Sequence, residues 1–232
     1  MIVQIYSLTH PEDVSMLVEM GVDHIGLAPA GQGLRSELDH EACRALFDLL
    51  PPHVFGAALT VRTELGAIVA MAEAVNPAIV HICSATDALS VEEQRRLRSR
   101  LPDGTKLMKA IEVGGPEMAD QALAAAEQFA PVSDYLLLDT DDPNITGIGA
   151  AGRVHDWDVS ARIVESVGTS VPVILAGGLS PDNVADAIRH VRPAGVDSFT
   201  WTNTAADSRR KDPERVRGFV QEARRAAAEL GL

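Results

Sequence analysis

Short apolar runs alternate with longer amphipathic segments along the chain, and this alternation occurs eight times. Most of the runs are rich in Val, Ile and Leu, and each is bounded by Gly, Pro or polar turn residues. This pattern predicts buried β-strands. The predicted strands span residues 3–8, 24–28, 54–61, 78–83, 106–113, 134–139, 171–177 and 195–200.

The segments between the runs carry apolar residues at i, i+3 and i+4, which predicts amphipathic helices. In one of them Ser90 stands three residues before Glu93, the pattern of a capping box. Eight strand–helix units without a break in composition predict one (β/α)8 (TIM) barrel of the α/β class, a single domain over residues 1–232. Loops that follow the strands build the active site of such a barrel, so the long irregular segment 140–156 is expected there.

The composition narrows the choice of partners. A net charge of −13 and a pI near 4.9 disfavour nucleic acid and anionic membranes. No apolar run is long enough to span a membrane, and the strand-like start MIVQIYSL lacks the basic region of a signal peptide, so a cytoplasmic location is expected. Cys43 and Cys83 lie in different predicted elements without a CxxC spacing, which indicates reduced thiols.

Polar residues within the predicted strands are candidates for chemistry, because every second side chain of a barrel strand points inward. His81 and Cys83 share one parity in the fourth strand, and Gln4 and Tyr6 share one in the first. Asp139 ends the sixth strand after three leucines, at the catalytic face, and is the strongest single candidate.

Two loops carry candidate anion-binding groups. Arg35 lies in a glycine-rich loop after the second strand, where its guanidinium could hold a carboxylate or phosphate through two hydrogen bonds. Gly177 and Gly178 end the seventh strand before a helix, a place where backbone N–H groups commonly bind phosphate. The loop after the eighth strand, which usually completes such a site, is bulky here because it contains Trp201.

Together, the pieces LLLDT, GRVHDW, VPVILAGGLSPDNV, GVDS and KDPERVRGFV make the chain resemble the phosphoribosylanthranilate isomerase family of tryptophan biosynthesis. The resemblance implies an Amadori rearrangement of a sugar phosphate, without cofactor or metal, in which Asp139 is the general acid. It also implies that Arg35 contacts the anthranilate end of the substrate and that Gly177 and Gly178 bind its phosphate. Gly152 and His155 fall at the end of the family's glycine-rich loop, in which Ala150 replaces a glycine.

The sequence departs from the family pattern at the expected catalytic face. Tyr6 stands where the family has its catalytic cysteine, and Thr200 and Trp201 stand where it has a Ser-Gly pair that binds phosphate. A tyrosine is a costly base, since its pKa near 10 would have to fall by about three units. We therefore expect Cys83 or His81 to supply the base. We also expect the phosphate site to be reshaped and the substrate to differ from that of the tryptophan pathway.

Other functions remain open at this stage. A divalent ion in a metal-assisted epimerase or aldolase could be bound by a set made of His81, Asp139, His155 and Asp156. Lys109, in the fifth strand, could form a Schiff base in an aldolase, although a charged structural partner is the simpler interpretation. A non-catalytic ligand-binding barrel would also explain the absent cysteine. The chain is expected to be a monomer or a homodimer.

Overall fold

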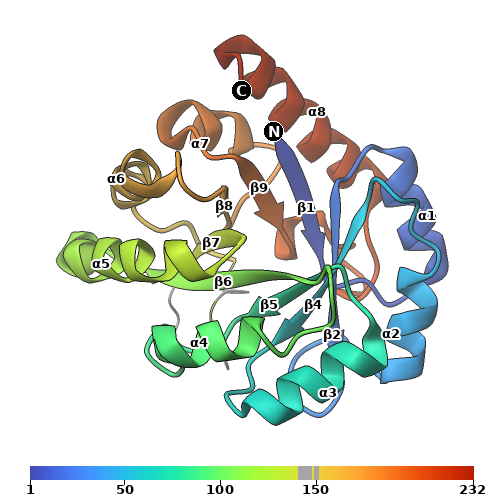
Figure 1. Cartoon of the computed structure of the whole chain (residues 1–232). Helices are drawn as coiled ribbons and strands as arrows, with labels where there is room; N and C mark the ends of the chain where they lie inside the picture. Colours follow the sequence, from blue (N-terminus) through green and yellow to red (C-terminus); the bar gives the residue numbers. More distant parts are fainter. Residues whose placement is uncertain (141–147, 149–151) are drawn as a thin grey trace.

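The computed structural model describes residues 1–140, 148 and 152–232, and Ala150 with most of the 140–156 segment lies outside them. Eight parallel strands form a closed barrel, as predicted, in the order β1-β9-β8-β7-β6-β5-β4-β2 with β2 paired back to β1 (Figure 1). The strands are β1 (Ile2–Tyr6), β2 (His24–Pro29), β4 (Phe55–Thr60), β5 (Ile79–Ile82), β6 (Lys106–Val113), β7 (Tyr135–Thr140), β8 (Val173–Leu175) and β9 (Gly195–Ser198).

The described helices pack around the outside of the barrel (Figure 1). Several begin with a side chain that accepts a backbone N–H, and Ser90 and Glu93 form the predicted capping box. The helices are α1 (Pro11–Glu19), α2 (His40–Phe47), α3 (Leu65–Val75), α4 (Val91–Arg98), α5 (Ala119–Phe129), α6 (Trp157–Val167), α7 (Val184–Val191) and α8 (Pro213–Leu230).

The last two predicted strands are shorter than expected. β8 ends at Leu175, before Gly177 and Gly178, which both have positive φ angles and turn the chain. β9 ends at Ser198 and is followed by a 3-10 turn, Thr200–Thr202. A two-residue strand, β3 (Glu37–Leu38), was not predicted; it pairs with β2 beyond the barrel.

The two faces of the strands pack into two separate apolar clusters. Val3 and Ile5 pack outward against the helices, whereas Tyr6 and Cys83 belong to the smaller cluster inside the barrel. The predicted alternation of inward and outward side chains is therefore confirmed for the first and fourth barrel strands. Ile148 also joins the inner cluster, and its N–H donates to the carbonyl oxygen of Cys83.

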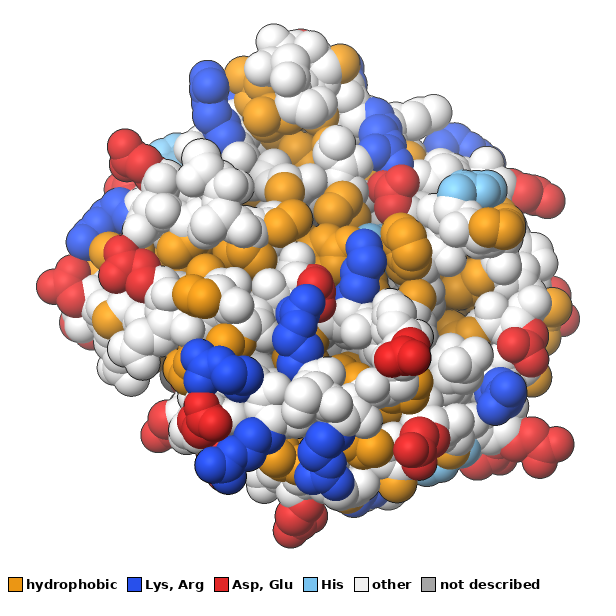
Figure 2. Space-filling view, in the orientation of Figure 1, with side chains coloured by type: hydrophobic (Ala, Val, Ile, Leu, Met, Phe, Trp, Pro, Cys, Tyr) orange, Lys and Arg blue, Asp and Glu red, His pale blue; other side chains and the backbone are white. Residues whose placement is uncertain are grey.

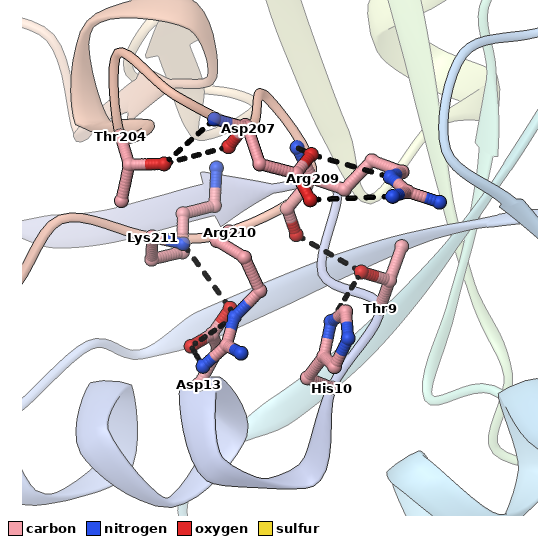
Figure 3. Close-up of polar contacts among 8 residues, drawn as sticks. All are labelled: Thr9, His10, Asp13, Thr204, Asp207, Arg209, Arg210 and Lys211. Carbon is pink, nitrogen blue, oxygen red and sulfur yellow. Dashed lines mark hydrogen bonds and ion pairs between the residues drawn. The ribbon is translucent and has the colours of Figure 1, made fainter.

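A polar clasp joins the start of the chain to the loop before α8 (Figure 3). The Asp13 carboxylate, which is buried at the start of α1, accepts hydrogen bonds from the Arg210 guanidinium and from the backbone N–H of Lys211. Lys211 Nζ donates to the carbonyl oxygen of Tyr6 and, at 2.6 Å, to Asn203 Oδ1. The clasp therefore ties β1 to the segment that follows β9, next to the seam where the barrel closes.

Charge on the surface is mixed in sign. Figure 2 shows acidic and basic side chains interspersed over one face, at its edge and also at its centre, where they lie among apolar side chains. This distribution agrees with a net charge that is spread over the outer surface. Among the described residues, no helix has both the length and the apolar character needed to cross a membrane.

We expect Gly26→Ala to lower the free energy of unfolding by about 1–3 kcal/mol, a typical cost of overpacking. A Cβ at residue 26 would lie 2.1 Å from the Tyr6 ring, which covers this glycine inside the barrel. Urea denaturation measures the effect. In a Tyr6→Ala background the same change should cost clearly less, and equal costs in both backgrounds would contradict the explanation. Gly66→Ala, in the open on α3, is the control and should not destabilise the protein.

Candidate active site

A pocket of about 270 Å3 opens at the carboxyl ends of β7, β8 and β9. This is the barrel face at which active sites of this architecture form. Five of the predicted site residues line it together with Asp139, and the full lining is Asp139, Gly152, Gly177, Gly178, Leu179, Asp197, Ser198, Phe199, Thr200 and Trp201.

Two buried carboxyl groups, Asp139 from β7 and Asp197 from β9, lie in this pocket. Burial raises the pKa of Asp139 to about 7, although the N–H of Thr140 donates to its Oδ1 and opposes the shift. Burial, reinforced by the charge of Asp139, raises the pKa of Asp197 to about 8. Near neutral pH this pair therefore holds at least one proton, and such a pair can both donate and accept protons.

Asp197 is not among the site residues predicted from the sequence. Its Oδ1 accepts a hydrogen bond of 3.1 Å from Gln4 Nε2, and Gln4 Oε1 lies 3.1 Å from His24 Nδ1. The sequence could have indicated Asp197, because it is a carboxyl residue at an inward position of the last strand. It was overlooked because strand parity was applied only to the first and fourth strands.

The rest of the pocket suits an anion. Among the described residues, the backbone N–H groups of Gly177, Gly178, Leu179, Thr200 and Trp201 have no hydrogen-bond acceptor. All five residues line the pocket. Such a cluster of backbone N–H groups is a typical phosphate site.

Trp201 does not close this site. Its indole, 45% exposed, lies at the rim, where Nε1 donates to the carbonyl oxygen of Gly152 at 3.1 Å. Residue 201 lies in a 3-10 turn without a positive φ angle, so this backbone needs no glycine. The phosphate site is therefore reshaped, as expected, because the Trp201 side chain adds to the lining of the pocket. Thr200 lies beside Trp201 in that lining.

Tyr6, His81 and Cys83 come together inside the barrel but do not line the described pocket. Tyr6 Oη lies 2.6 Å from His81 Nδ1, and His81 Nε2 lies 3.2 Å from Cys83 Sγ. Burial raises the pKa of Tyr6 and Cys83 well above their ordinary values and lowers that of His81 to about 3. All three side chains are therefore neutral near pH 7. The Cys83 thiol does not form the thiolate that a base requires, and the low pKa of His81 makes its imidazole a weak base. The catalytic role of these residues stays a prediction.

Two of the predicted substrate-binding residues lie outside the pocket. His155 is buried behind Gly177, and its ring nitrogens contact Thr140 Oγ1 at 3.1 Å and Ser160 Oγ at 2.7 Å. Arg35 is exposed on the loop after β2. That loop is ordered by Glu37, whose carboxylate accepts the N–H groups of Gly31, Gln32 and Leu34.

The predicted metal set is dispersed. His81 contacts Tyr6 and Cys83, whereas Asp156 caps α6. No three His, Cys, Asp or Glu residues of the described part of the chain form a group that could hold a metal ion.

Lys109 points away from the barrel interior, because its neighbours Met108 and Ala110 belong to the inner cluster. Its Nζ donates to the carbonyl oxygen of Ser84 at 3.0 Å and lies over the Phe129 ring. The Schiff-base interpretation is therefore not favoured, and a structural role fits these contacts.

Comparison with known proteins identifies the family. The family model for N-(5'-phosphoribosyl)anthranilate (PRA) isomerase matches residues 67–222. The chain belongs to this isomerase family. It is 34% identical over 225 residues to the N-(5'-phosphoribosyl)anthranilate isomerase of Methanocella arvoryzae, covering 96% of this chain and 97% of the relative. The enzyme of that name from Haloferax volcanii is 32% identical, with 97% and 93% covered.

Solved structures of the family share the fold. The phosphoribosyl anthranilate isomerase of Thermotoga maritima superposes with a TM-score of 0.76 at 28% identity, covering 97% of this chain and 99% of the other. A family structure in complex with reduced 1-(o-carboxyphenylamino)-1-deoxyribulose 5-phosphate matches with a TM-score of 0.73 at 27% identity and the same coverage. The relatives are named for the standard reaction of the family, so the expectation of a different substrate finds no support in them.

We expect Asp139→Asn and Asp197→Asn each to gain stability over wild type as the pH rises from 6.5 to 9. The unfolded chain has lost both carboxyl protons by pH 6.5, whereas the folded chain retains them until pH 7–8. Each group thus stabilises the fold at low pH, and that stability is lost as pH rises through the folded pKa, by at most about 1.4 kcal/mol per pH unit.

Urea denaturation at several pH values measures this difference. The buried histidines, whose pKa values are lowered to about 3–4, change protonation only below this window. A difference between variant and wild type that does not change with pH would show that the carboxyl groups are ionised throughout.

Proposed function

We propose that this protein converts N-(5'-phosphoribosyl)anthranilate into 1-(o-carboxyphenylamino)-1-deoxyribulose 5-phosphate, the reaction for which its relatives are named. Asp139 is the general acid that protonates the ring oxygen of the sugar. The observation that carries this proposal is that one pocket combines a buried carboxyl group with five backbone N–H groups that have no acceptor among the described residues.

Asp139 has the properties that a general acid needs. A carboxyl group with an ordinary pKa is ionised at pH 7, whereas burial raises the pKa of Asp139 to about 7 and keeps a large fraction protonated. The proton is therefore available to the leaving oxygen as the bond from C1 to the ring oxygen breaks.

The phosphate of the substrate is proposed to bind between the loops after β8 and β9. Gly177 and Gly178 have φ angles of +82° and +64°, a conformation that favours glycine and exposes their N–H groups. A side chain at residue 178 would also lie within 2.5 Å of the Arg153 backbone. A phosphate there places the sugar beside Asp139, since both groups line one pocket.

The anthranilate carboxylate is proposed to bind Arg35, as the family resemblance implies. Arg35 follows β2, and one strand, β1, separates β2 from β9 in the strand order. A cytoplasmic monomer or homodimer built as one domain remains the expected form; a family member from Thermotoga maritima is described as dimeric.

We expect the wild-type chain to restore growth of a tryptophan-auxotrophic bacterium that lacks this isomerase, and Asp139→Asn to abolish it. With purified protein, Asp139→Asn should lower kcat by about 10²–10⁴-fold, the usual contribution of a general acid. The measurement is the rate of conversion of N-(5'-phosphoribosyl)anthranilate.

Glu117→Gln, at the surface beyond β6, is the matched control and should complement as wild type does. No growth with well-expressed, folded wild-type protein would refute the proposed reaction. It would turn attention to the alternative, a non-catalytic ligand-binding barrel.

We expect Arg35→Lys to raise KM about tenfold and to leave kcat within a few-fold of wild type. A lysine keeps the charge but loses the paired hydrogen bonds to a carboxylate, and tenfold corresponds to about 1.4 kcal/mol. Steady-state kinetics test this, with Arg95→Lys on the exposed side of α4 as the control. An unchanged KM would remove Arg35 from the binding site.

A further inference from the structure

We propose that Asp197 is the general base of the isomerisation and that Gln4 is its positioning residue. The inference rests on the proposed function and assigns the proton acceptor that the family's missing cysteine leaves open. It replaces Cys83 and His81, which were expected to supply this base.

The pocket itself restricts the choice of base. Among the described residues that line it, Asp139 and Asp197 are the two with titratable side chains. Asp139 gives its proton to the ring oxygen, so a second group is needed to accept the proton from C2. Tyr6 cannot serve readily, since its hydroxyl is occupied by His81 at 2.6 Å inside the barrel.

The two carboxyl groups flank the proposed phosphate site. β8 lies between β7 and β9 in the barrel, and its end forms the turn with Gly177 and Gly178. Asp139 and Asp197 are the penultimate residues of β7 and β9, so a sugar anchored by its phosphate at this turn has one carboxyl group on each side. The rearrangement needs an acid for the ring oxygen and a base for C2, and the pocket supplies one carboxyl group for each.

Gln4 fixes the orientation of Asp197. The Gln4 amide donates to Asp197 Oδ1 through Nε2, and its Oε1 accepts from His24 Nδ1. The imidazole of His24 is itself held edge-on against the rings of Phe55 and Tyr135. No described residue donates to Asp197 Oδ2, which leaves this oxygen for the substrate.

The charged and titratable groups around Asp197 come from four elements. Burial and, after it, the charge of Asp139 on β7 oppose ionisation of Asp197 and raise its pKa to about 8, whereas the Gln4 hydrogen bond and Lys211, before α8, favour ionisation. The ionised form that acts as the base therefore becomes the major form as the pH rises through about 8. Tyr6, on β1, and Cys83, directly after β5, are neutral near pH 7 because burial raises the pKa of both. Burial lowers the pKa of Lys211 to about 7. Its Nζ has three acceptors, the carbonyl oxygens of Tyr6 and Phe199 and the Asn203 amide oxygen, which match the three donors of the ammonium form.

The proposed cycle conserves every proton. Asp139 protonates the ring oxygen as the C1–O bond breaks and the nitrogen lone pair forms a C1=N bond. Asp197 removes the C2 proton; the C–H electron pair forms C1=C2, and the C1=N pair returns to nitrogen. Asp197 then protonates C1 while the C2 hydroxyl returns its proton to Asp139, which gives the ketone and restores both carboxyl groups.

The decisive variant is Asp197→Asn, measured in the full-length protein. We expect kcat to fall about 10³-fold, as for loss of a general base, with a larger isotope effect when C2 carries deuterium. Binding of reduced 1-(o-carboxyphenylamino)-1-deoxyribulose 5-phosphate should stay within a few-fold of wild type. Asp186→Asn, on the exposed side of α7, is the matched control and should keep wild-type kcat.

Chemical rescue guards against a folding defect. In Asp197→Ala, added formate should restore part of the activity, because a free carboxylate can occupy the vacated space. A variant that is merely misfolded would not respond to formate.

The positioning role of Gln4 has its own readout. Its hydrogen bond lowers the pKa of Asp197, so Gln4→Met should move the acidic limb of the kcat/KM profile to higher pH as well as lower kcat. A lower kcat with an unmoved profile would reduce Gln4 to a structural residue.

The outcomes separate the two proposals. If wild type is active and Asp197→Asn keeps kcat within tenfold, the inference fails and the proposed function stands. Loss of activity in Cys83→Ser but not in Asp197→Asn would return the base to the Tyr6, His81 and Cys83 cluster. If wild-type protein does not convert the substrate, the proposed function fails and the inference falls with it.

Discussion

Closure of the barrel creates a dry interior, and the rest of the structure depends on how polar groups are accommodated there. A buried polar group without a partner costs about 1–3 kcal/mol, so each inward polar side chain has to find one. Gln4 joins Asp197 to His24, and His81 joins Tyr6 to Cys83. The first string joins the neighbouring strands β9, β1 and β2, and the second joins β1 to β5 and to the residue that follows it.

The absence of water in the interior also sets the pKa values of the site residues. Removal from water is the largest influence on both Asp139 and Asp197, and it moves each carboxyl group towards neutrality at pH 7. Burial makes Cys83 less suitable for proton transfer, since a thiol that cannot ionise is a poor base. Burial therefore selects carboxyl groups over the thiol for proton transfer in this interior.

Much of the fold could be predicted from the sequence, because strand and helix periodicities are local. The alternation of His81 with Ile82 was sufficient to place these two side chains on opposite faces of their strand. The glycines at 177 and 178 were sufficient to place the turn after β8. The site was harder, since the pairing of Gln4 with Asp197 joins residues 193 positions apart and depends on closure. The rim position of Trp201 also escaped prediction, because it depends on a rotamer and on a hydrogen bond to Gly152.

The pairing of β1 with β9 affects how the chain folds while it is being synthesised. Ile2 pairs with Gly195, and Lys211 must arrive before the carbonyl of Tyr6 is bound. At about 5–20 residues per second, a ribosome needs roughly 10–40 s to travel that far. Throughout this time the first strand of the nascent chain has an unpaired edge, which is open to pairing with other chains. That edge of β1 therefore lacks its native partner until the last barrel strand has been made.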